Sequence, residues 1–375
     1  MVDTEQRLLS HGGHRVERLE FSNYAIASAP EAARTAALSI YNPASRRRTT
    51  DAIQLLKPDV LHVHNFFPVA SPSVFDAAHE AGVATVLTLH NYRLGCLNGF
   101  FFRDGHVCQD CLGRLPLPGV RHRCYRGSAA GSAAVATMLA VHRARRTWHT
   151  RVDRFVALTE FARRTFEEIG RPPERLSVKA NCAARPPLSP ARRDGFVFVG
   201  CLSVEKGVDV LLKAWAHRPE PLTIVGEGPD SVRLKALASP TTRFTGGLPK
   251  DEVLRRMAGA HAVLLPSLWF EGFPMTVAEA FSTGTPVVAS RIGALAAIVT
   301  DGHDGLHFKP GDAADLDRVI GSGEGQAERF ARLGQGAAST WETSLSPAAS
   351  LRALETIYAR AIVSRAAAQL PRIER

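Results

Sequence analysis

The sequence predicts an α/β protein with two halves, each built on a mostly parallel sheet. Short apolar runs rich in β-branched residues alternate with helical patterns along most of the 375 residues, which is typical of βα units. A chain of this length exceeds one ordinary hydrophobic core. Residues 181–194 are rich in proline and poor in apolar residues, so we expect them to link the two halves.

The first half starts with a helical pattern at residues 4–10. Five strands are predicted after it, at residues 14–21, 60–64, 84–90, 154–158 and 176–180. A Rossmann-like half opens with a strand and a Gly-rich loop before its first helix. We therefore expect this domain to lack its opening strand, through either a misassigned start or a truncation that would impair catalysis.

The second half has five predicted strands, at residues 195–202, 222–225, 243–245, 261–265 and 286–289. A last helical pattern covers residues 347–368. We accordingly predict an N-terminal domain at 1–182 with a cysteine-containing insertion at about 96–124, a C-terminal domain at 183–345, and a terminal helical segment at 346–375.

Composition and charge narrow the cellular setting. No apolar run approaches the roughly 18 to 20 residues of a membrane span, and the first residues lack the features of a signal peptide. Six cysteines without an export signal indicate a reducing cytoplasm. The net charge of +10 comes largely from clustered arginines, which suits either an anionic membrane surface at the inner face or a merely basic exterior. Nucleic acid is disfavoured because basic and aromatic residues do not interleave.

Two glutamates stand out in the run EGFPMTVAEA at residues 271–280. Glu271 falls in a loop after a predicted buried strand, and Glu279 falls inside the next predicted helix. Pro274 suits the first turn of that helix. Amides at the start of a helix favour an anion, and carboxylates accept hydrogen bonds from hydroxyl groups. The spacing therefore suits a phosphate flanked by sugar hydroxyls, although a bare pair of this kind is usually a loop glutamate and a solvated helix glutamate.

Further motifs follow one another in a fixed order around this pair. They read FVGCLSVEKG (198–207), IVGEGP (224–229), FTG (244–246), EGFP (271–274) with Glu279-Ala280, GTPVVAS (284–290) and DGHDGLHF (301–308). Together they resemble the retaining glycosyltransferases of family 4 (group 1), over nearly the whole chain. The resemblance implies the GT-B fold, in which two Rossmann-like doubly wound domains face a cleft and the terminal helix returns to the first domain.

The resemblance also implies roles for individual residues. Lys206 would reach the diphosphate of a nucleotide-sugar donor, Glu271 would accept from the hydroxyls of its sugar, and Glu279 from its ribose. The backbone at Gly226, Gly228 and Gly246 would approach the base or ribose closely. The segment that would meet the distal phosphate comprises Gly272, Phe273, Pro274, Met275 and Thr276. Cys201 stands where the family usually has an arginine, which puts full activity in doubt.

Three polar residues of the first half are candidates for the acceptor side. His90 ends a predicted strand and faces the crevice where open α/β sheets bind ligands, and family members place a histidine there beside the transferred sugar. A lone histidine after an apolar strand is more often structural. His64 and Asn65, after the preceding strand, are weaker candidates.

Four cysteines gather in the insertion of the first half, which also contains Phe100 to Phe102. They are Cys96, Cys108, Cys111 and Cys124, with Cys108 and Cys111 in a C-x2-C pair. Four thiols at this spacing allow a structural zinc site, but reduced structural thiols explain them equally well and redox chemistry is a third reading.

We therefore expect a cytoplasmic retaining glycosyltransferase, either free or peripheral to the inner membrane face, that acts in surface polysaccharide synthesis. Its partners would be a nucleotide-diphosphate sugar and a saccharide or lipid-linked saccharide, and catalysis would need no metal. The alternatives are a truncated, non-catalytic nucleotide-sugar-binding relative and an epimerase or hydrolase on the same fold.

Overall fold

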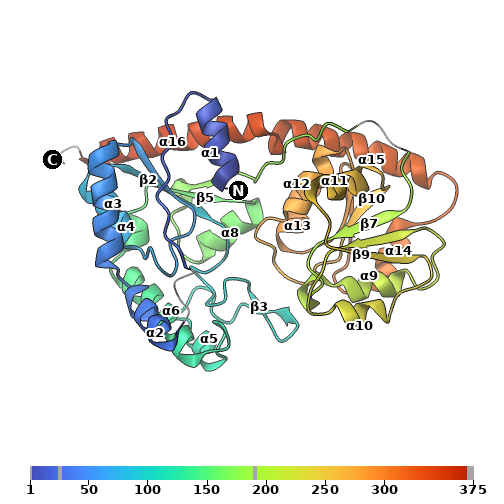
Figure 1. Cartoon of the computed structure of the whole chain (residues 1–375), viewed down its shortest axis with the longest axis horizontal. Coiled ribbons are helices and arrows are strands. Elements are labelled where there is room, and N and C mark those ends of the chain that lie inside the picture. Colours follow the sequence, from blue (N-terminus) through green and yellow to red (C-terminus); the bar gives the residue numbers. More distant parts are fainter. Residues whose placement is uncertain (1, 24–27, 189–191, 370–375) are drawn as a thin grey trace. The chain divides into compact units, whose positions relative to one another are not determined.

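The computed structural model describes residues 2–23, 28–188 and 192–369 (Figure 1). The chain divides into two compact units. The first contains residues up to Phe101, Gln109–Lys179 and Leu351 onward, and the second contains Phe102–Cys108 and Ala180–Ser350. Each unit is an α/β domain around one parallel sheet.

The first unit has a four-stranded parallel sheet in the order β1-β2-β5-β6. Its central strand β2 is buried along its whole length, as expected for a parallel sheet covered on both faces. Its elements are α1 (Val2–His11), α2 (Ala29–Leu38), α3 (Pro43–Leu56), β1 (Val60–Val63), α4 (Ser73–Glu80), β2 (Ala84–Leu89), α5 (Leu117–Arg121), α6 (Ala129–Ala144), α7 (Thr147–Thr150), β5 (Arg154–Ala157), α8 (Glu160–Glu168), a 3-10 turn at Pro173–Arg175, and β6 (Leu176–Val178).

The second unit has a six-stranded parallel sheet in the order β12-β11-β10-β7-β8-β9. A short hairpin, β3 (Phe102–Arg103) with β4 (His106–Val107), is grouped with it. The other elements are β7 (Phe196–Val199), a 3-10 turn at Val204–Lys206, α9 (Val208–Ala214), β8 (Leu222–Val225), α10 (Ser231–Lys235), β9 (Thr242–Gly246), α11 (Lys250–Ala258), β10 (Ala262–Leu265), α12 (Met275–Ser282), β11 (Val287–Ser290), α13 (Gly293–Ile298), β12 (Gly305–Phe308), α14 (Ala313–Ile320), α15 (Gln326–Thr340), and a π-helical turn at Trp341–Leu345. The last helix, α16 (Pro347–Gln369), starts in this unit and belongs to the first unit from Leu351 onward.

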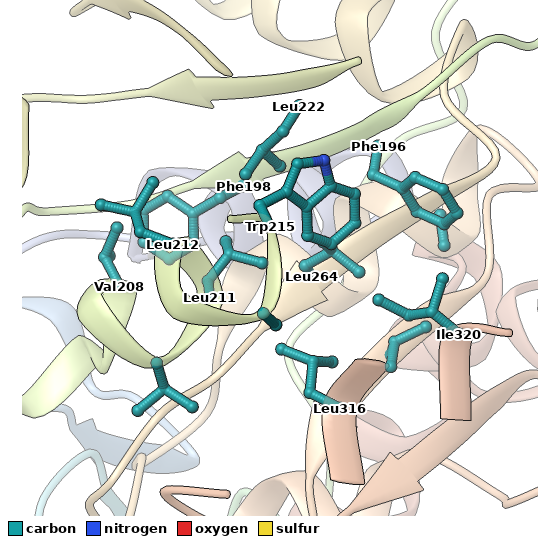
Figure 2. Packing of buried hydrophobic residues seen from close by; sticks show 14 of the residues in the cluster. Phe196, Phe198, Val208, Leu211, Leu212, Trp215, Leu222, Leu264, Leu316 and Ile320 are labelled. Atoms are coloured by element: carbon teal, nitrogen blue, oxygen red, sulfur yellow. The ribbon is translucent and has the colours of Figure 1, made fainter. Parts of the chain in front are cut away.

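Alternation along β7 divides the core of the second unit between the two faces of its sheet. Phe196 and Phe198 pack on one face around the fully buried Trp215 (Figure 2). Val197 packs on the opposite face, with Phe281 of α12. The Trp215 indole N–H donates to the Glu220 carbonyl at 2.9 Å, so this large side chain is buried without an unsatisfied polar atom.

The last helix, α16, covers one face of the first sheet. Ile357 and Ala361 pack against Val86 and Val156. Near its end, the Arg365 guanidinium meets the Asp153 carboxylate, with 2.8 Å between Arg365 Nη2 and Asp153 Oδ2. Both apolar packing and a buried ion pair therefore fix α16 on this unit.

The predicted strand at residues 14–21 is wrong, because this described segment forms neither helix nor strand. Its arginine and glutamate side chains face solvent and form ion pairs, such as Arg15 with Glu17 at 3.3 Å. Too few apolar residues remain for a strand that buries a face. The other predicted strands all form within a few residues of their predicted bounds.

One strand of the second sheet was not predicted. Gly305–Phe308 forms β12 beside β11. A Cβ at position 305 would lie 2.1 Å from the Val287 carbonyl oxygen, so the two strands approach closely only because Gly305 has no side chain.

Candidate functional site

The site residues of the second unit lie on loops at the carboxyl ends of its strands. Lys206 follows β7 and Glu271 follows β10. Between them lies Gly207, whose φ is +65° and whose added Cβ would lie 2.0 Å from the Pro266 carbonyl oxygen. The Leu268 amide also donates to the Glu205 carbonyl at 2.8 Å. Only glycine permits this approach, which brings Lys206 and Glu271 together.

Glu271 is a buried carboxylate with oriented donors. Its Oε1 accepts from Lys206 Nζ at 2.7 Å and from Ser267 Oγ at 2.9 Å. Lys206 also lies 5.3 Å from the centre of the Trp269 ring. The Lys206 side chain is 23% exposed and that of Glu271 is 9% exposed, so the ammonium is the more accessible partner. This arrangement presents a positive charge held by a fixed carboxylate.

Helix α12 carries the second glutamate of the predicted pair. It runs from Met275 to Ser282, and Pro274 is its N-cap residue rather than part of its first turn as predicted. Gly272 and Phe273 lie in the loop just before it, and Thr276 lies in its first turn. Glu279 forms an ion pair with Lys250 of α11. The side chain of Glu279 is 14% exposed and that of Lys250 is 56% exposed, so a ligand hydroxyl could replace the lysine.

The predicted glycines line the loop after β7. A Cβ at Gly226 would lie 1.9 Å from the Gly200 carbonyl oxygen, and one at Gly228 would lie 2.3 Å from the Leu202 carbonyl oxygen. These glycines therefore allow two loops to pack backbone to backbone. At the end of β9, Gly246 has a φ of +73°. Cys201 is exposed on the loop after β7.

In the first unit the structure brings His90 and His64 together. His64 follows β1 and His90 follows β2, two neighbouring parallel strands. Their nitrogens, His64 Nδ1 and His90 Nε2, lie 3.0 Å apart. Asn65 is exposed, and its side chain accepts from the Phe67 amide at 3.4 Å. The two histidines therefore belong to one hydrogen-bonded group. The Asn65 side chain instead makes a local hydrogen bond with the Phe67 amide.

Five residues of this group, Glu5, His62, Thr88, Lys179 and Tyr358, were missed by the sequence analysis. Glu5 of α1 approaches His64 Nε2 with Oε2 at 3.1 Å and accepts from Lys179 Nζ with Oε1 at 2.6 Å. The contact with His64 deviates from the ideal N–H···O line, and Oε2 has no other partner among the described residues. His62 bonds Tyr358 of α16 at 2.8 Å and Thr88 at 2.7 Å. The repeat of histidine at positions 62 and 64, which puts both on one face of a strand, was the available signal.

Burial and charge set the protonation states of this group. Burial alone would raise the pKa of Glu5, but the hydrogen bond from His64 and the charge of Lys179 outweigh it and hold that pKa well below its usual range. Burial, reinforced by His64, lowers the pKa of His90 to about 4. Burial also lowers the pKa of His62 well below its usual range. At neutral pH the cluster therefore contains the Glu5 carboxylate beside neutral histidines at positions 62 and 90.

One group of described residues has the spacing of a metal site. The donor atoms of Glu5, His62 and His64 lie within 4.8 Å of one another, but both nitrogens of His62 are engaged with Tyr358 and Thr88. Glu5 is in turn paired with Lys179. These contacts favour a hydrogen-bonded network over a metal centre.

The cysteines of the predicted zinc site lie in different surroundings. Cys96 and Cys111 are buried, whereas Cys108 and Cys124 are half-buried. The Cys96 thiol donates to Asn98 Oδ1 at 2.9 Å. Of the neighbouring phenylalanines, Phe101 is fully buried and Phe100 is 45% exposed. The structural zinc site stays a prediction.

Comparisons with known proteins agree with this architecture. A model of the glycosyl transferase 4-like domain matches residues 3–182, and a model of the glycosyl transferases group 1 matches residues 184–339. A glycogen synthase of Mycobacterium tuberculosis is 36% identical over 151 residues, which cover 37% of this chain and 35% of the relative. A phosphatidyl-myo-inositol mannosyltransferase of Mycobacterium leprae is 29% identical over 231 residues, or 56% of this chain and 61% of the relative. The matches thus span less than two thirds of these relatives.

Solved structures share the fold at low sequence identity. The Anabaena protein HepE in complex with UDP has a TM-score of 0.59 at 18% identity, covering 84% of this chain and 82% of that one. Sucrose-phosphate synthase of Thermosynechococcus elongatus has a TM-score of 0.62 at 16% identity, covering 87% and 79%. The two Rossmann-like domains define a protein of the GT-B class.

The two family models together match nearly all of the sequence. The chain belongs to the group 1 glycosyltransferases, which confirms the family resemblance. Within the described ranges, no helix is both long and apolar enough to cross a membrane.

Proposed function

We propose that this protein is a retaining glycosyltransferase that transfers a hexosyl group from a nucleotide-diphosphate sugar to a saccharide or lipid-linked saccharide. The observation that carries the proposal is the pairing of Lys206 with Glu271 on adjoining loops of the second unit. Gly207 permits this approach, and alanine could not replace it because its Cβ would overlap the Pro266 carbonyl oxygen.

Each polar residue of the second unit then has a role in holding the donor. Lys206 neutralises the diphosphate and stabilises the charge that develops as the sugar departs. Glu271 orients the sugar by accepting from its hydroxyls, and Glu279 accepts from the ribose. The amides at the start of α12 contribute to the distal phosphate. Positioning and charge stabilisation carry the reaction, and we propose that it needs no metal, with the acceptor attacking on the leaving group's own face.

His90 would meet the transferred sugar as a hydrogen-bond acceptor. An ionised Glu5 accepts only, so the proton of His64 belongs on Nε2, which faces Glu5. His64 Nδ1 then accepts from His90 Nε2, and His90 Nδ1 keeps a lone pair for a ligand hydroxyl.

This chain of hydrogen bonds predicts a change of tautomer in Glu5→Gln. Lys179 would retain the amide oxygen, the amide nitrogen would donate to His64, and both His64 and His90 would become Nδ1–H tautomers. Long-range ¹H–¹⁵N spectra of histidine-labelled protein, assigned with His90→Gln, distinguish the two forms. We also expect kcat to fall about tenfold, equivalent to one hydrogen bond. Glu355→Gln, which alters the exposed His14–Glu355 pair at 3.0 Å, is the control, and a wild-type His90 protonated on Nδ1 would contradict the proposed order.

Surface polysaccharide synthesis in the cytoplasm, at the inner face of the membrane, is the setting we propose. The charge of +10 supports contact with an anionic membrane surface. One observation favours a second candidate, a non-catalytic nucleotide-sugar-binding relative. The exposed Cys201 occupies the loop position from which an arginine would be expected to reach the diphosphate, and loss of that guanidinium weakens phosphate binding.

Thermal unfolding with UDP-, GDP- and ADP-sugars tests the donor site. We expect one nucleotide class to raise the Tm by a few degrees, Glu279→Ala to abolish the rise, and Cys201→Arg to enlarge it. Release of that nucleoside diphosphate upon addition of an acceptor would distinguish a transferase from the non-catalytic relative and from an epimerase. A folded protein that responds to no donor would contradict the proposed function.

A further inference from the structure

A small cavity in the first unit is positively charged and contains no acidic side chain. Its volume is about 40 Å³, and its lining includes Arg114, Arg143 and Arg171 beside apolar residues such as Leu139 and Trp148. Neither aspartate nor glutamate is among the residues that line it. The cavity therefore gathers cations without the counter-charge that normally accompanies them.

Arg171 is fixed in this cavity by the end of α8. Gly170 turns the chain with a φ of +84°, and the Arg171 amide donates to the Phe166 carbonyl at 2.9 Å. The residue is only 6% exposed. Its Nη2 makes a long contact of 3.4 Å with the Ile169 carbonyl, whereas Nε and Nη1 are buried and have no partner among the described residues.

The electrostatics of Arg171 indicate a missing anion. Burial, and then the charge of Arg143, lowers the pKa of Arg171 to about 10. The guanidinium nevertheless remains charged at neutral pH. A buried charge is strongly unfavourable unless it is paired and hydrogen-bonded, and two cations that repel each other across an acid-free cavity add to this penalty. An oxyanion would satisfy the unused donors and the charge at once.

We propose that this cavity is a binding site for a phosphate group, held chiefly by Arg171, with the exposed Arg143 also among its lining residues. A single water needs roughly 10 to 15 Å³ of such volume, so the cavity has room for a larger polyatomic group. Guanidinium groups match the geometry of phosphate oxygens. The site lies within the first unit and does not depend on the donor site of the second unit. Leu115 at the cavity and Leu117 nearby in sequence are 51% and 66% exposed, so the phosphate can come from solution or from a lipid headgroup.

Inorganic phosphate is the first probe, at constant ionic strength maintained with chloride. We expect the wild-type Tm to rise by about 5 °C once phosphate exceeds its Kd about 100-fold. Arg171→Met should lose this response yet unfold at the wild-type Tm or above it, because an unpaired buried cation is removed. Arg164→Met, which alters an exposed arginine on α8, should keep the response. Lys206→Ala should also keep it, which separates this cavity from the donor site.

Vesicles are the second probe and identify the source of the phosphate. Phosphatidylcholine vesicles with and without phosphatidylglycerol are mixed with the protein and sedimented. Co-sedimentation that needs phosphatidylglycerol and is lost in Arg171→Met supports a lipid headgroup, and a Tm response to phosphate without such co-sedimentation supports a soluble phosphate. The proposal is overturned if neither probe acts on the wild type, or if Arg171→Met responds to both as the wild type does.

Discussion

Replacing Lys206 with alanine should lower kcat/KM by about 10²- to 10³-fold. The expected loss matches removal of one preorganised donor from a site of developing negative charge. Lys206 Nζ is held 2.7 Å from Glu271 Oε1, and this fixed position avoids reorganisation during the reaction. Steady-state kinetics with the donor identified by thermal unfolding would measure the effect.

Lys213→Ala is the matched control for this substitution. Lys213 lies on α9, shortly after Lys206 in sequence, and its side chain is 64% exposed and pairs with Asp209 at 3.3 Å. An exposed pair of this kind contributes little, so kcat/KM should stay within about twofold of wild type. If Lys206→Ala behaved like Lys213→Ala in a protein that still binds its donor, Lys206 would have no part in the reaction.

Asp153→Ala should destabilise the first unit by about 3 to 5 kcal/mol, because it strips a buried cation of its partner. Asp153 Oδ2 accepts from Arg365 Nη2 at 2.8 Å, from Arg365 Nε at 3.1 Å, and from the Thr85 amide at 2.8 Å. The side chains of Asp153 and Arg365 are 8% and 6% exposed. Differential scanning calorimetry would report a lower transition temperature for this unit.

A double substitution distinguishes the ion pair from mere loss of packing. Asp153→Ala combined with Arg365→Met removes both charges and should recover part of the lost stability. Asp3→Ala, which breaks the exposed pair with Arg18, should change the free energy of unfolding by less than about 1 kcal/mol. Equal destabilisation by Asp153→Ala and by the double substitution would show that the Asp153–Arg365 charge pair is not the cause.

The sequence was informative where local patterns determine structure. Buried strands such as Ala84–Leu89 can be predicted because they are apolar runs bounded by turns. The loop containing Lys206 could be predicted because Gly207 and its neighbours form a motif. Only the structure shows why residue 207 must be glycine, which is its close approach to the Pro266 carbonyl oxygen. The strand predicted at residues 14–21 does not form. Its apolar residues Val16, Leu19 and Phe21 alternate only imperfectly with charged residues that prefer solvent.

The network around His64 could not be predicted because its members are distant in sequence. Glu5 and Lys179 meet although 174 residues separate them, and His62 and Tyr358 meet across 296 residues. No periodicity or spacing encodes such a pairing, which depends on how α1 and α16 pack on the sheet. His90 was identified as a candidate from its place at the end of β2, but the group that orients it was not.

The return of α16 to the first unit bears on the order in which the protein can be completed during synthesis. Arg365 and Tyr358 are made after the whole of the second unit, yet Asp153 and His62 of the first unit require them as partners. Synthesis proceeds at roughly 5 to 20 residues per second. For a time on the order of ten seconds, the first unit therefore lacks the partner of its Asp153 carboxylate and the helix that covers one face of its sheet. During that interval the nascent chain offers chaperones an apolar surface that the finished protein no longer exposes.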